Sequence, residues 1–315
     1  MAAVSGFWRR LLVAFSDAAP SLRTIARTAD GGRTRRLLLA FSDASPAFRP
    51  AATRLDHPEG YDQARAADRP EPLSHCADVV VDTDTRERQP LVLCLDTSSS
   101  MAGGPIQALN TALREWTEEL HSDSFLSSTV EVAVVTFGGQ GVTVWRGPRP
   151  LPPRTSASPF IRADLFEPPH LSAAGVTPMT EALKLSVRLV AARKAEHRET
   201  GVPYYRPSVL LVTDGMPTDS QGHPSNNWRE LVPMLADQQQ ARRLRLYAIG
   251  MGGITNAGYE VLEALAPDFN ARLPGFPFRE LFQMISASAG VVQRDAGDDV
   301  HAEIFAHFKS AWEAS

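Results

Sequence analysis

Cysteine is scarce in this sequence, and long apolar runs are missing. The chain of 315 residues has only two cysteines, Cys76 and Cys94, too few for a disulfide framework or a structural zinc site of their own. Cys94 stands inside an apolar run, where a buried core residue is expected. The apolar runs, such as LVLCL at 91–95, have the length of a strand. A membrane-spanning helix needs about 20 apolar residues, so we expect no membrane segment.

Several catalytic motifs are absent as well. The sequence has no H-E-x-x-H pair, no G-x-S-x-G elbow and no G-x-x-x-x-G-K-[ST] loop, which are typical of zinc proteases, α/β-hydrolases and P-loop proteins. Asp82 and Asp84 invite comparison with an Asp-x-Asp-x-Thr phosphotransferase motif, but Arg86 occupies the threonine position. In IGMGGIT, Thr255 stands where a dinucleotide-binding fingerprint needs its third glycine. We therefore expect a protein that is not an enzyme.

Charge is present but unevenly distributed. The formal net charge is −4, while residues 1–54 hold nine Arg and three Asp with no Lys or Glu, which gives +6 there and −10 in the remainder. The overall balance predicts no strong attraction to nucleic acid or to acidic membranes. The apolar content of 43% and the charged content of 22% are those of a soluble globular protein. The apolar patch near the N-terminus is too short for a secretory signal, so we expect a cytoplasmic protein.

The basic segment, residues 1–54, contains a duplicated peptide. RRLLVAFSDAAPSLR at 9–23 returns as RRLLLAFSDASPAFR at 35–49. Each copy could form one short amphipathic helix, which is marginal in water by itself. One interpretation is a largely disordered arm. We favour the other, a pair of docking peptides that gain avidity from duplication and could support self-association. The docking residues would be Arg9, Arg10, Leu11, Phe15 and Asp17 in the first copy and Arg35, Arg36, Leu37, Phe41 and Asp43 in the second.

The remaining chain divides by composition. Residues 55–76 are rich in Pro, Asp and Arg and predict a linker, residues 77–294 predict one folded domain, and residues 295–315 predict a tail with one more helix from Asp298 onward. Strands are expected at 77–83, 91–95, 129–139, 142–146, 208–215 and 244–253, and helices at 105–120, 177–194, 228–243, 258–265 and 278–290. Strands that alternate with helices predict an α/β fold with a doubly wound, mostly parallel sheet flanked by helices.

Oxygen-bearing side chains gather in three loops of the predicted domain. Asp96, Ser98 and Ser100 follow the buried strand at 91–95, Thr177 stands just ahead of a predicted helix, and Asp214 ends another buried strand. If these strands are neighbours in one parallel sheet, all three loops meet at the same edge. Carboxylate and hydroxyl oxygens are hard ligands, which suit Mg²⁺, with Mn²⁺ or Ca²⁺ as alternatives. The competing interpretation is that Asp96 and the serines only cap the following helix.

These residues resemble a known family. DTSSS at 96–100 matches the Asp-x-Ser-x-Ser signature of von Willebrand factor A domains, and Thr177 and Asp214 follow in the order and spacing of the remaining residues of that family's metal-ion-dependent adhesion site. Further pieces resemble its bacterial subfamily associated with tellurium resistance and stress. They are SMAGGPIQALNTAL, VVTFGG, FEPPHLSA with TPM, LLVTDGMPTD, YAIGMG and FRELFQMISAS, and together they span about 90–290.

The resemblance implies a mode of action. Ser98 and Ser100 would bind the cation directly, Thr177 directly or through water, and Asp96 and Asp214 mainly through water. The cation would accept a carboxylate from an acidic residue of a protein partner, which implies an adaptor in a bacterial stress-response or defence assembly. Two other classes stay open, a metal-assisted hydrolase that uses the same cation and a nucleic-acid-binding protein that uses the basic arm. The sequence places no general base by motif, and the arm has few aromatic residues for stacking on bases.

Overall fold

A computed structural model describes residues 86–139, 141–153, 155–291 and 298–313 of the chain. These residues belong to the second of two units of the chain, Cys76–Ser315. The duplicated peptides at 9–23 and 35–49, the predicted linker at 55–76 and the strand expected at 77–83 lie outside the described residues. Asp82 and Asp84 lie outside them too.

The central sheet confirms the predicted α/β architecture. Its strands follow the order β4-β3-β2-β1-β6-β7-β8, and β5 pairs with β2 off this path. The pairs that β1 makes with β2 and β6 are parallel, as are those of β6 with β7 and of β7 with β8, whereas β3 and β4 add an antiparallel edge. The strands are β1 Gln89–Thr97, β2 Val130–Gly138, β3 Gly141–Arg146, β4 Arg149–Pro150, β5 Ile161–Arg162, β6 Ser208–Thr213, β7 Arg245–Gly250 and β8 Asn270–Arg272.

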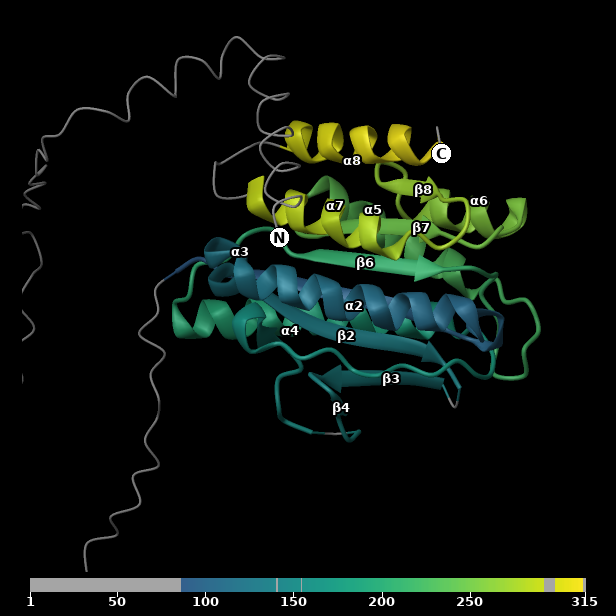
Figure 1. The fold of residues 1–315 in the computed structure, drawn as a ribbon, viewed down its shortest axis with the longest axis horizontal. Helices are drawn as coiled ribbons and strands as arrows, with labels where there is room; N and C mark the ends of the chain where they lie inside the picture. Colours follow the sequence, from purple (N-terminus) through teal and green to yellow (C-terminus); the bar gives the residue numbers. More distant parts are fainter. Residues whose placement is uncertain (1–85, 140, 154, 292–297, 314–315) are drawn as a thin grey trace, which may run out of the picture. The chain divides into compact units, whose positions relative to one another are not determined.

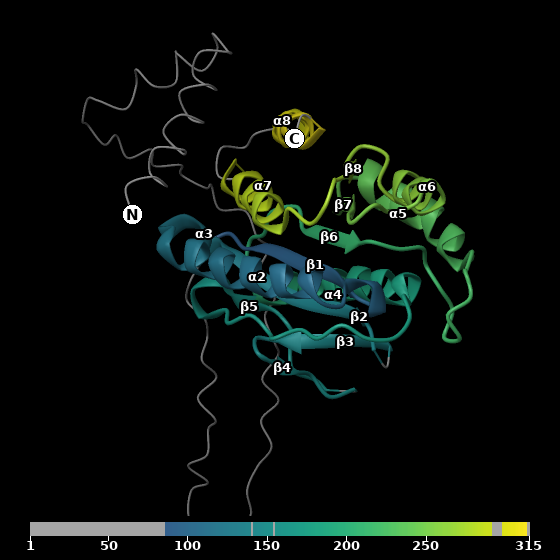
Figure 2. The same cartoon turned by 45° about the vertical axis from the view of Figure 1, so that its right-hand side comes forward.

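Helices lie on both faces of this sheet (Figure 1, Figure 2). The side chains of β1 alternate between the faces: Val92 and Cys94 join a core with residues of α4, α5 and α6, while Leu91 lies with Ile285 and Ala289 of α7 on the other side. The α-helices are α2 Gly104–Ser122, α3 Ser124–Thr129, α4 Met179–Thr200, α5 Leu231–Gln240, α6 Asn256–Leu265, α7 Phe278–Val291 and α8 Asp298–Glu313; short 3-10 helices are η2 Ser99–Met101, η3 Ala163–Leu165 and η4 Asn227–Glu230.

The best predicted helix is α2. Its apolar residues recur at helical spacing, and Ile106, Leu109, Leu113, Trp116 and Leu120 are all buried. Trp116 stacks on Phe282 of α7 with ring centroids 5.1 Å apart, and its indole Nε1 donates a hydrogen bond to Ser286 Oγ. The chain enters α2 through Gly103, at a φ of 82°, and Gly104-Pro105. The helix α2 therefore begins immediately after the loop that follows β1.

Two predicted helix boundaries are wrong. The helix expected at 177–194 begins at Met179, after Pro178, and continues to Thr200, where Gly201 at a φ of 72° ends it in the left-handed conformation. The last two turns of this helix have a polar sequence, which does not indicate that His197 is buried. The helix expected at 228–243 is divided into η4 and α5 and ends at Gln240.

The short elements α3 and β8 are absent from the sequence prediction, because single turns and three-residue strands carry too little periodicity. The helix α8 begins at Asp298, where the sequence leads us to expect one, and packs against α7. No helix in the described part of the chain is both long and apolar enough to cross a membrane.

Candidate metal centre

Asp96 is the residue from which the site is built. It is the penultimate residue of β1 and only 1% exposed. Its Oδ1 accepts a hydrogen bond from the backbone N–H of Ser98 at 2.8 Å. Its Oδ2 accepts one from the hydroxyl of Thr213 at 2.6 Å. Because Thr213 ends the neighbouring strand β6, the carboxylate is fixed between its own loop and that strand.

The two serines connect this loop to the end of β6. Ser98 and Ser100 flank the start of the short 3-10 helix η2, which brings both hydroxyls to one side, and their Oγ atoms are 3.0 Å apart. The hydroxyl of Ser100 donates to Oδ1 of Asp214 at 2.7 Å. Ser100 and Asp214 are 114 positions apart in the sequence, and the contact forms because β1 and β6 are adjacent in the sheet.

A third segment crosses the ends of β1 and β2. The backbone N–H of Ser99 donates to the carbonyl of Gly175 at 3.0 Å, and the N–H of Ala174 donates to the carbonyl of Thr97 at 2.9 Å. Gly175 also bridges Gly139. Its φ is 73°, and a Cβ at this position would collide with the backbone of Gly139. Only glycine therefore allows the segment to lie so close to the sheet edge.

Thr177 follows this crossing and leads into α4. It is buried, with 7% of its surface exposed, and its carbonyl accepts a hydrogen bond from the N–H of Met179 at 2.7 Å. A Cβ built on Gly215 would lie 3.8 Å from the Thr177 Oγ1. The hydroxyl of Thr177 therefore lies beside the Asp214–Gly215 segment, near the other site residues.

All five residues predicted from the sequence thus lie at one edge of the sheet, Asp96, Ser98, Ser100, Thr177 and Asp214. The strands β2 and β6 point toward this edge at the right of Figure 1. From β1 the chain continues to β2 on one side, and β6 lies on the other. The loops after β1 and β6 diverge at this switch point, which is the usual ligand position in open α/β sheets.

Burial dominates the electrostatics of the two carboxylates. It raises the pKa of Asp96 to about 6, although the hydrogen bonds from Ser98 and Thr213 act in the opposite direction and Asp214 adds repulsion. Burial also raises the pKa of Asp214, against the hydrogen bond from Ser100. Two acids in one small volume therefore hold their negative charge at a cost that a cation would relieve.

The donor set fits a hard divalent cation. Mg²⁺ and Ca²⁺ both take carboxylate and hydroxyl oxygens as ligands, Mg²⁺ in octahedral geometry and Ca²⁺ with six to eight ligands. The Oγ atoms of Ser98 and Ser100 are hydrogen-bonded at 3.0 Å, and Ser100 Oγ is hydrogen-bonded to Asp214 Oδ1 at 2.7 Å, so three oxygen donors from two loops lie together. Among the described residues no group of three or more His, Cys, Asp or Glu side chains could hold a metal, so the hydroxyls are an essential part of this donor set.

Two residues that the sequence analysis did not assign support the site. Thr213 holds Oδ2 of Asp96, and Thr218 binds the backbone of Thr177 through its hydroxyl at 2.8 Å. Thr213 could be recognised from a hydroxyl at the last position of a strand beside β1. Cys94 is fully buried, as expected for a core residue, and burial raises the pKa of its thiol to about 12.

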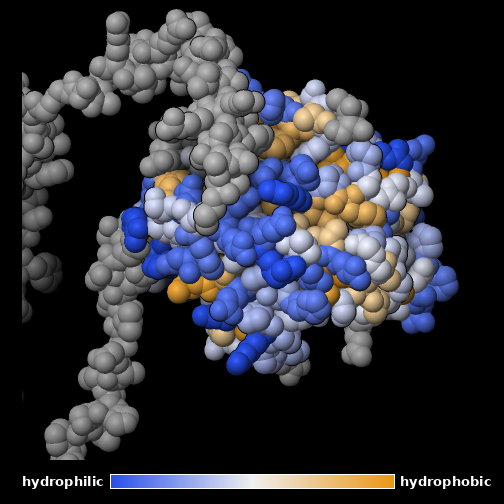
Figure 3. Space-filling view, in the orientation of Figure 1, coloured by the Kyte–Doolittle hydropathy of each residue, from blue (hydrophilic) through white to orange (hydrophobic). Residues whose placement is uncertain are grey.

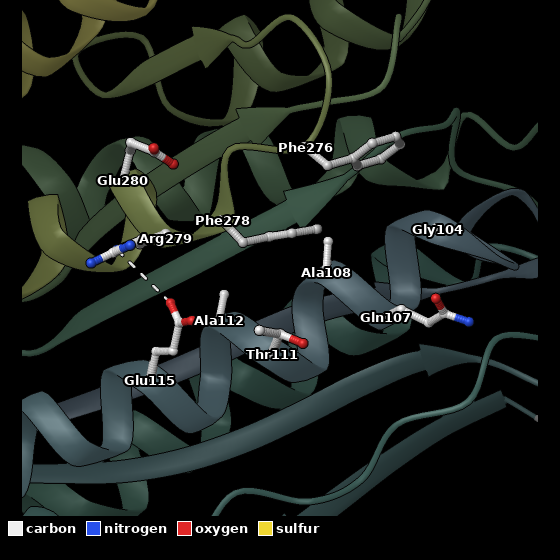
Figure 4. A pocket seen from close by; sticks show the side chains of 10 residues that line it. All are labelled: Gly104, Gln107, Ala108, Thr111, Ala112, Glu115, Phe276, Phe278, Arg279 and Glu280. Carbon is white, nitrogen blue, oxygen red and sulfur yellow. Dashed lines mark ion pairs between the residues drawn. The ribbon is translucent and has the colours of Figure 1, made fainter.

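A separate groove lies between α2 and the start of α7 (Figure 4). Its volume is about 390 Å³, and Ala108, Ala112 and Phe278 line it together with the ion pair of Glu115 and Arg279. None of the five site residues lines it. On the face that carries α2 and α7, hydrophilic and hydrophobic residues are mixed (Figure 3).

Solved structures with a similar fold include three proteins of known source. The pilus adhesin SpaC from Lactobacillus rhamnosus GG is 13% identical at a TM-score of 0.47, over 67% of this chain and 31% of SpaC. The manganese-loaded Plasmodium vivax TRAP protein is 19% identical at 0.38, over 63% and 72%. Proximal thread matrix protein 1 from the mussel byssus, solved with a zinc-occupied MIDAS motif, is 16% identical at 0.39, over 66% and 46%. The chain thus spans less than half the length of SpaC and of the mussel protein.

A comparison with curated proteins finds no match. A family model, in contrast, matches residues 91–280, from the buried segment of β1 to the first turn of α7, and its description is von Willebrand factor type A domain. That match includes the three loops that carry Asp96, Thr177 and Asp214. The chain belongs to the von Willebrand factor type A domain family.

Proposed function

We propose that this domain binds Mg²⁺ at Asp96, Ser98, Ser100, Thr177 and Asp214 and uses the ion to capture an acidic residue of a protein partner. The observation that carries the proposal is the spacing of three oxygens from two loops, Ser98 Oγ, Ser100 Oγ and Asp214 Oδ1, at 3.0 and 2.7 Å. Both contacts are hydrogen bonds, and they gather hydroxyl and carboxylate oxygens of the kind that Mg²⁺ binds. Mn²⁺ and Ca²⁺ are the alternative ions.

The residues of the site would take different roles. Ser98 and Ser100 would contribute hydroxyl oxygens directly, and Thr177 would contribute its hydroxyl directly or through water. Asp96 accepts hydrogen bonds from Ser98 and Thr213, and Asp214 accepts one from Ser100, so both would orient the hydroxyls and balance the charge. When bound, Mg²⁺ would offer a position for a carboxylate of the partner, because few charged ligands neutralise it.

Calorimetry tests the metal-binding part of this proposal. The full chain, freed of divalent cations with EDTA and dialysed, should bind Mg²⁺ with a stoichiometry of one per chain, and Asp96→Ala should abolish the binding. Asp237→Ala is the matched control, since Asp237 lies on α5, outside the three loops that carry the proposed ligands, and its exposed carboxylate pairs with Arg243 at 3.3 Å. Absence of saturable Mg²⁺, Mn²⁺ and Ca²⁺ binding by the wild type would refute the proposal.

The partner could be a second copy of this chain. Each duplicated peptide carries an aspartate, Asp17 or Asp43, and an aspartate is the group that such a site would accept. Sedimentation velocity should then show Mg²⁺-dependent self-association that EDTA reverses and that Asp17→Asn with Asp43→Asn removes. Self-association unchanged by EDTA and by both substitutions would contradict this choice of partner.

We place the protein, as part of the same proposal, in a cytoplasmic assembly of a bacterial stress response or defence system, as an adaptor without enzymatic activity. The support is the resemblance of LLVTDGMPTD, YAIGMG and FRELFQMISAS to the tellurium-resistance subfamily. A phosphatase assay with p-nitrophenyl phosphate and Mg²⁺ tests the alternative of a hydrolase. Activity that disappears in Asp96→Ala would favour the enzyme over the adaptor.

A further inference from the structure

Thr218 makes two reciprocal hydrogen bonds with Thr177. The backbone N–H of Thr177 donates to Oγ1 of Thr218 at 2.8 Å, and the backbone N–H of Thr218 donates to the carbonyl of Thr177 at 2.9 Å. Thr218 is half-buried and stands four residues after Asp214. The loop that carries one proposed ligand, Asp214, therefore holds the backbone of another, Thr177.

The loop around Thr218 is itself fixed. Thr218 and Pro224 form an antiparallel bridge, and the N–H of Ser225 donates to the carbonyl of Pro217 at 2.9 Å. Asp219 closes the tip, because its Oδ1 accepts hydrogen bonds from the N–H groups of the residues two and four positions later, at 2.8 and 2.9 Å. Thr218 is thus presented to Thr177 by a closed hairpin-like loop.

The same loop also contacts the residue before Thr177. Gly222 has a φ of 86°, and a Cβ there would lie 3.1 Å from Cγ1 of Val176. On the other side, Gly175 is tied to the loop after β1 through the hydrogen bond from Ser99. The short segment 175–177 therefore lies between the two loops that carry the other proposed ligands.

Thr177 depends on these contacts because it is outside regular secondary structure. The helix α4 begins only at Met179, and Thr177 belongs to no helix or strand. The hydroxyl of Thr218 is the acceptor for its buried N–H. Loss of that acceptor leaves a buried N–H without a partner, which favours movement of the segment toward water.

We propose that Thr218 is a positioning residue of the metal centre, which holds Thr177 so that its hydroxyl faces the ion. This inference rests on the proposed function, because it gives Thr218 a role only if the site binds a cation. Thr218 would not itself contact the ion. Its hydroxyl connects the loop after β6 to the segment before α4. This connection would fix the distance between Asp214 in that loop and Thr177 in that segment.

Isosteric and conservative substitutions test this role. Thr218→Val removes the hydroxyl at nearly constant volume, and Thr218→Ser keeps it. Thr255→Val is the matched control, since Thr255 lies in a loop at the same edge of the sheet and its hydroxyl accepts a backbone hydrogen bond from Gly258 at 3.1 Å. Thr218→Ala serves as a second variant in case the valine prevents folding.

Two quantities should change together. In Thr218→Val the Mg²⁺ dissociation constant, measured by calorimetry, should rise about tenfold, and the amide of Thr177 should exchange its hydrogen about tenfold faster in the metal-free protein, as expected for the loss of one buried hydrogen bond. Thr218→Ser should restore both values, and Thr255→Val should leave both unchanged. The exchange rate reports the hydrogen bond independently of any bound metal.

The outcomes separate this inference from the proposed function. Wild-type protein that binds Mg²⁺, with equal affinity in Thr218→Val, would overturn the positioning role and leave the metal centre intact. A lower Mg²⁺ affinity in Thr218→Val that Thr218→Ser does not restore would also overturn the positioning role, because the loss would then come from the shape of the side chain and not from its hydroxyl. Wild-type protein without saturable Mg²⁺ binding would overturn both.

Discussion

Two buried carboxylates on adjacent strands differ in what neutralises them. Asp96 lies near the C-terminal end of β1 and is 1% exposed, and Glu131 lies near the N-terminal end of β2 and is 3% exposed. Glu131 accepts hydrogen bonds from Arg193 Nε at 2.8 Å and from His197 Nε2 at 3.0 Å, both on α4. Asp96 receives hydrogen bonds from a backbone N–H and a hydroxyl, and no ion pair of Asp96 is found within the residues that the structure describes.

The two pKa values move in opposite directions for this reason. Burial alone would raise the pKa of Glu131, but the hydrogen bonds and charges of His197 and Arg193 lower it to about 2. Burial raises the pKa of Asp96 to about 6, since its neutral donors compensate only in part. The fold thus provides a counter-charge for Glu131, which holds α4 on the sheet. For Asp96, the cation of the proposed function would supply the counter-charge.

The largest expected change in the free energy of unfolding concerns Glu131, the carboxylate with a counter-charge. Arg193→Met leaves Glu131 buried without its guanidinium partner, which should lower the free energy of unfolding by about 3 kcal/mol. Urea unfolding at pH 7 measures this change. Arg279→Met, which removes an exposed ion pair with Glu115 at 3.8 Å, is the control and should cost less than about 1 kcal/mol. Equal losses in the two variants would show that the Glu131 cluster does not stabilise the fold.

For Asp96, the carboxylate without an ion pair among the described residues, substitution should change the free energy of unfolding in the opposite direction. Asp96→Asn removes a buried charge, so in EDTA at pH 7 it should raise the free energy of unfolding by about 1–3 kcal/mol, as a rise of the pKa from 3.8 to about 6 implies. Urea unfolding again gives the value. A destabilised Asp96→Asn protein would mean that the carboxylate acts as a structural group like Glu131.

The pH dependence should separate the two residues further. The penalty for ionised Asp96 is complete above its folded pKa of about 6 and disappears as the pH falls below its unfolded value of 3.8. The stability difference between Asp96→Asn and the wild type in EDTA should therefore shrink toward zero between pH 7 and pH 4. The contribution of Glu131 is complete above pH 4.5 and is lost as the pH falls toward its folded pKa of about 2. A difference that stays constant from pH 7 to pH 4 would contradict the assignment to Asp96.

The smallest stability effect is expected at the exposed side of the centre. Ser100→Ala removes the hydrogen bond to Asp214, but Ser100 is exposed, so its unfolding free energy should change by less than about 1 kcal/mol. Its Mg²⁺ affinity in calorimetry should nevertheless fall about tenfold or more, since a ligand oxygen is lost. Ser122→Ala is a suitable control, since Ser122 is the exposed last residue of α2 and its hydroxyl donates to the carbonyl of Glu119 at 2.9 Å. Unchanged affinity in Ser100→Ala would remove Ser100 from the donor set.

The sequence alone predicts the longer strands of the sheet and, if those strands are neighbours, the meeting of the three loops. The apolar runs at 91–95 and 208–213 mark buried parallel strands, and the C-terminal ends of parallel strands share one edge. Asp96 and Asp214 could therefore be assigned to one site before any coordinates. That assignment depends only on β1 and β6 being adjacent strands, and not on their register.

The residues that support the site could not be predicted in the same way. The contact of Thr213 with Asp96 spans 117 positions, that of Thr218 with Thr177 spans 41, and that of Arg193 with Glu131 spans 62. Each depends on register and on the path of a loop, which hydrophobic periodicity does not contain. The extension of α4 to Thr200 was missed for the same reason, because only the packing on Glu131 explains buried charge in its last turns.

The carboxyl of Asp96 offers the most direct measurement. Its pKa can be followed by ¹³C NMR titration of the full chain, once in EDTA and once with saturating Mg²⁺. We expect about 6 in EDTA and a value lower by at least one pH unit with Mg²⁺, because the cation stabilises the charged form. A pKa near 4 in EDTA, or one that Mg²⁺ leaves unchanged, would contradict the proposal that a cation supplies the counter-charge of Asp96.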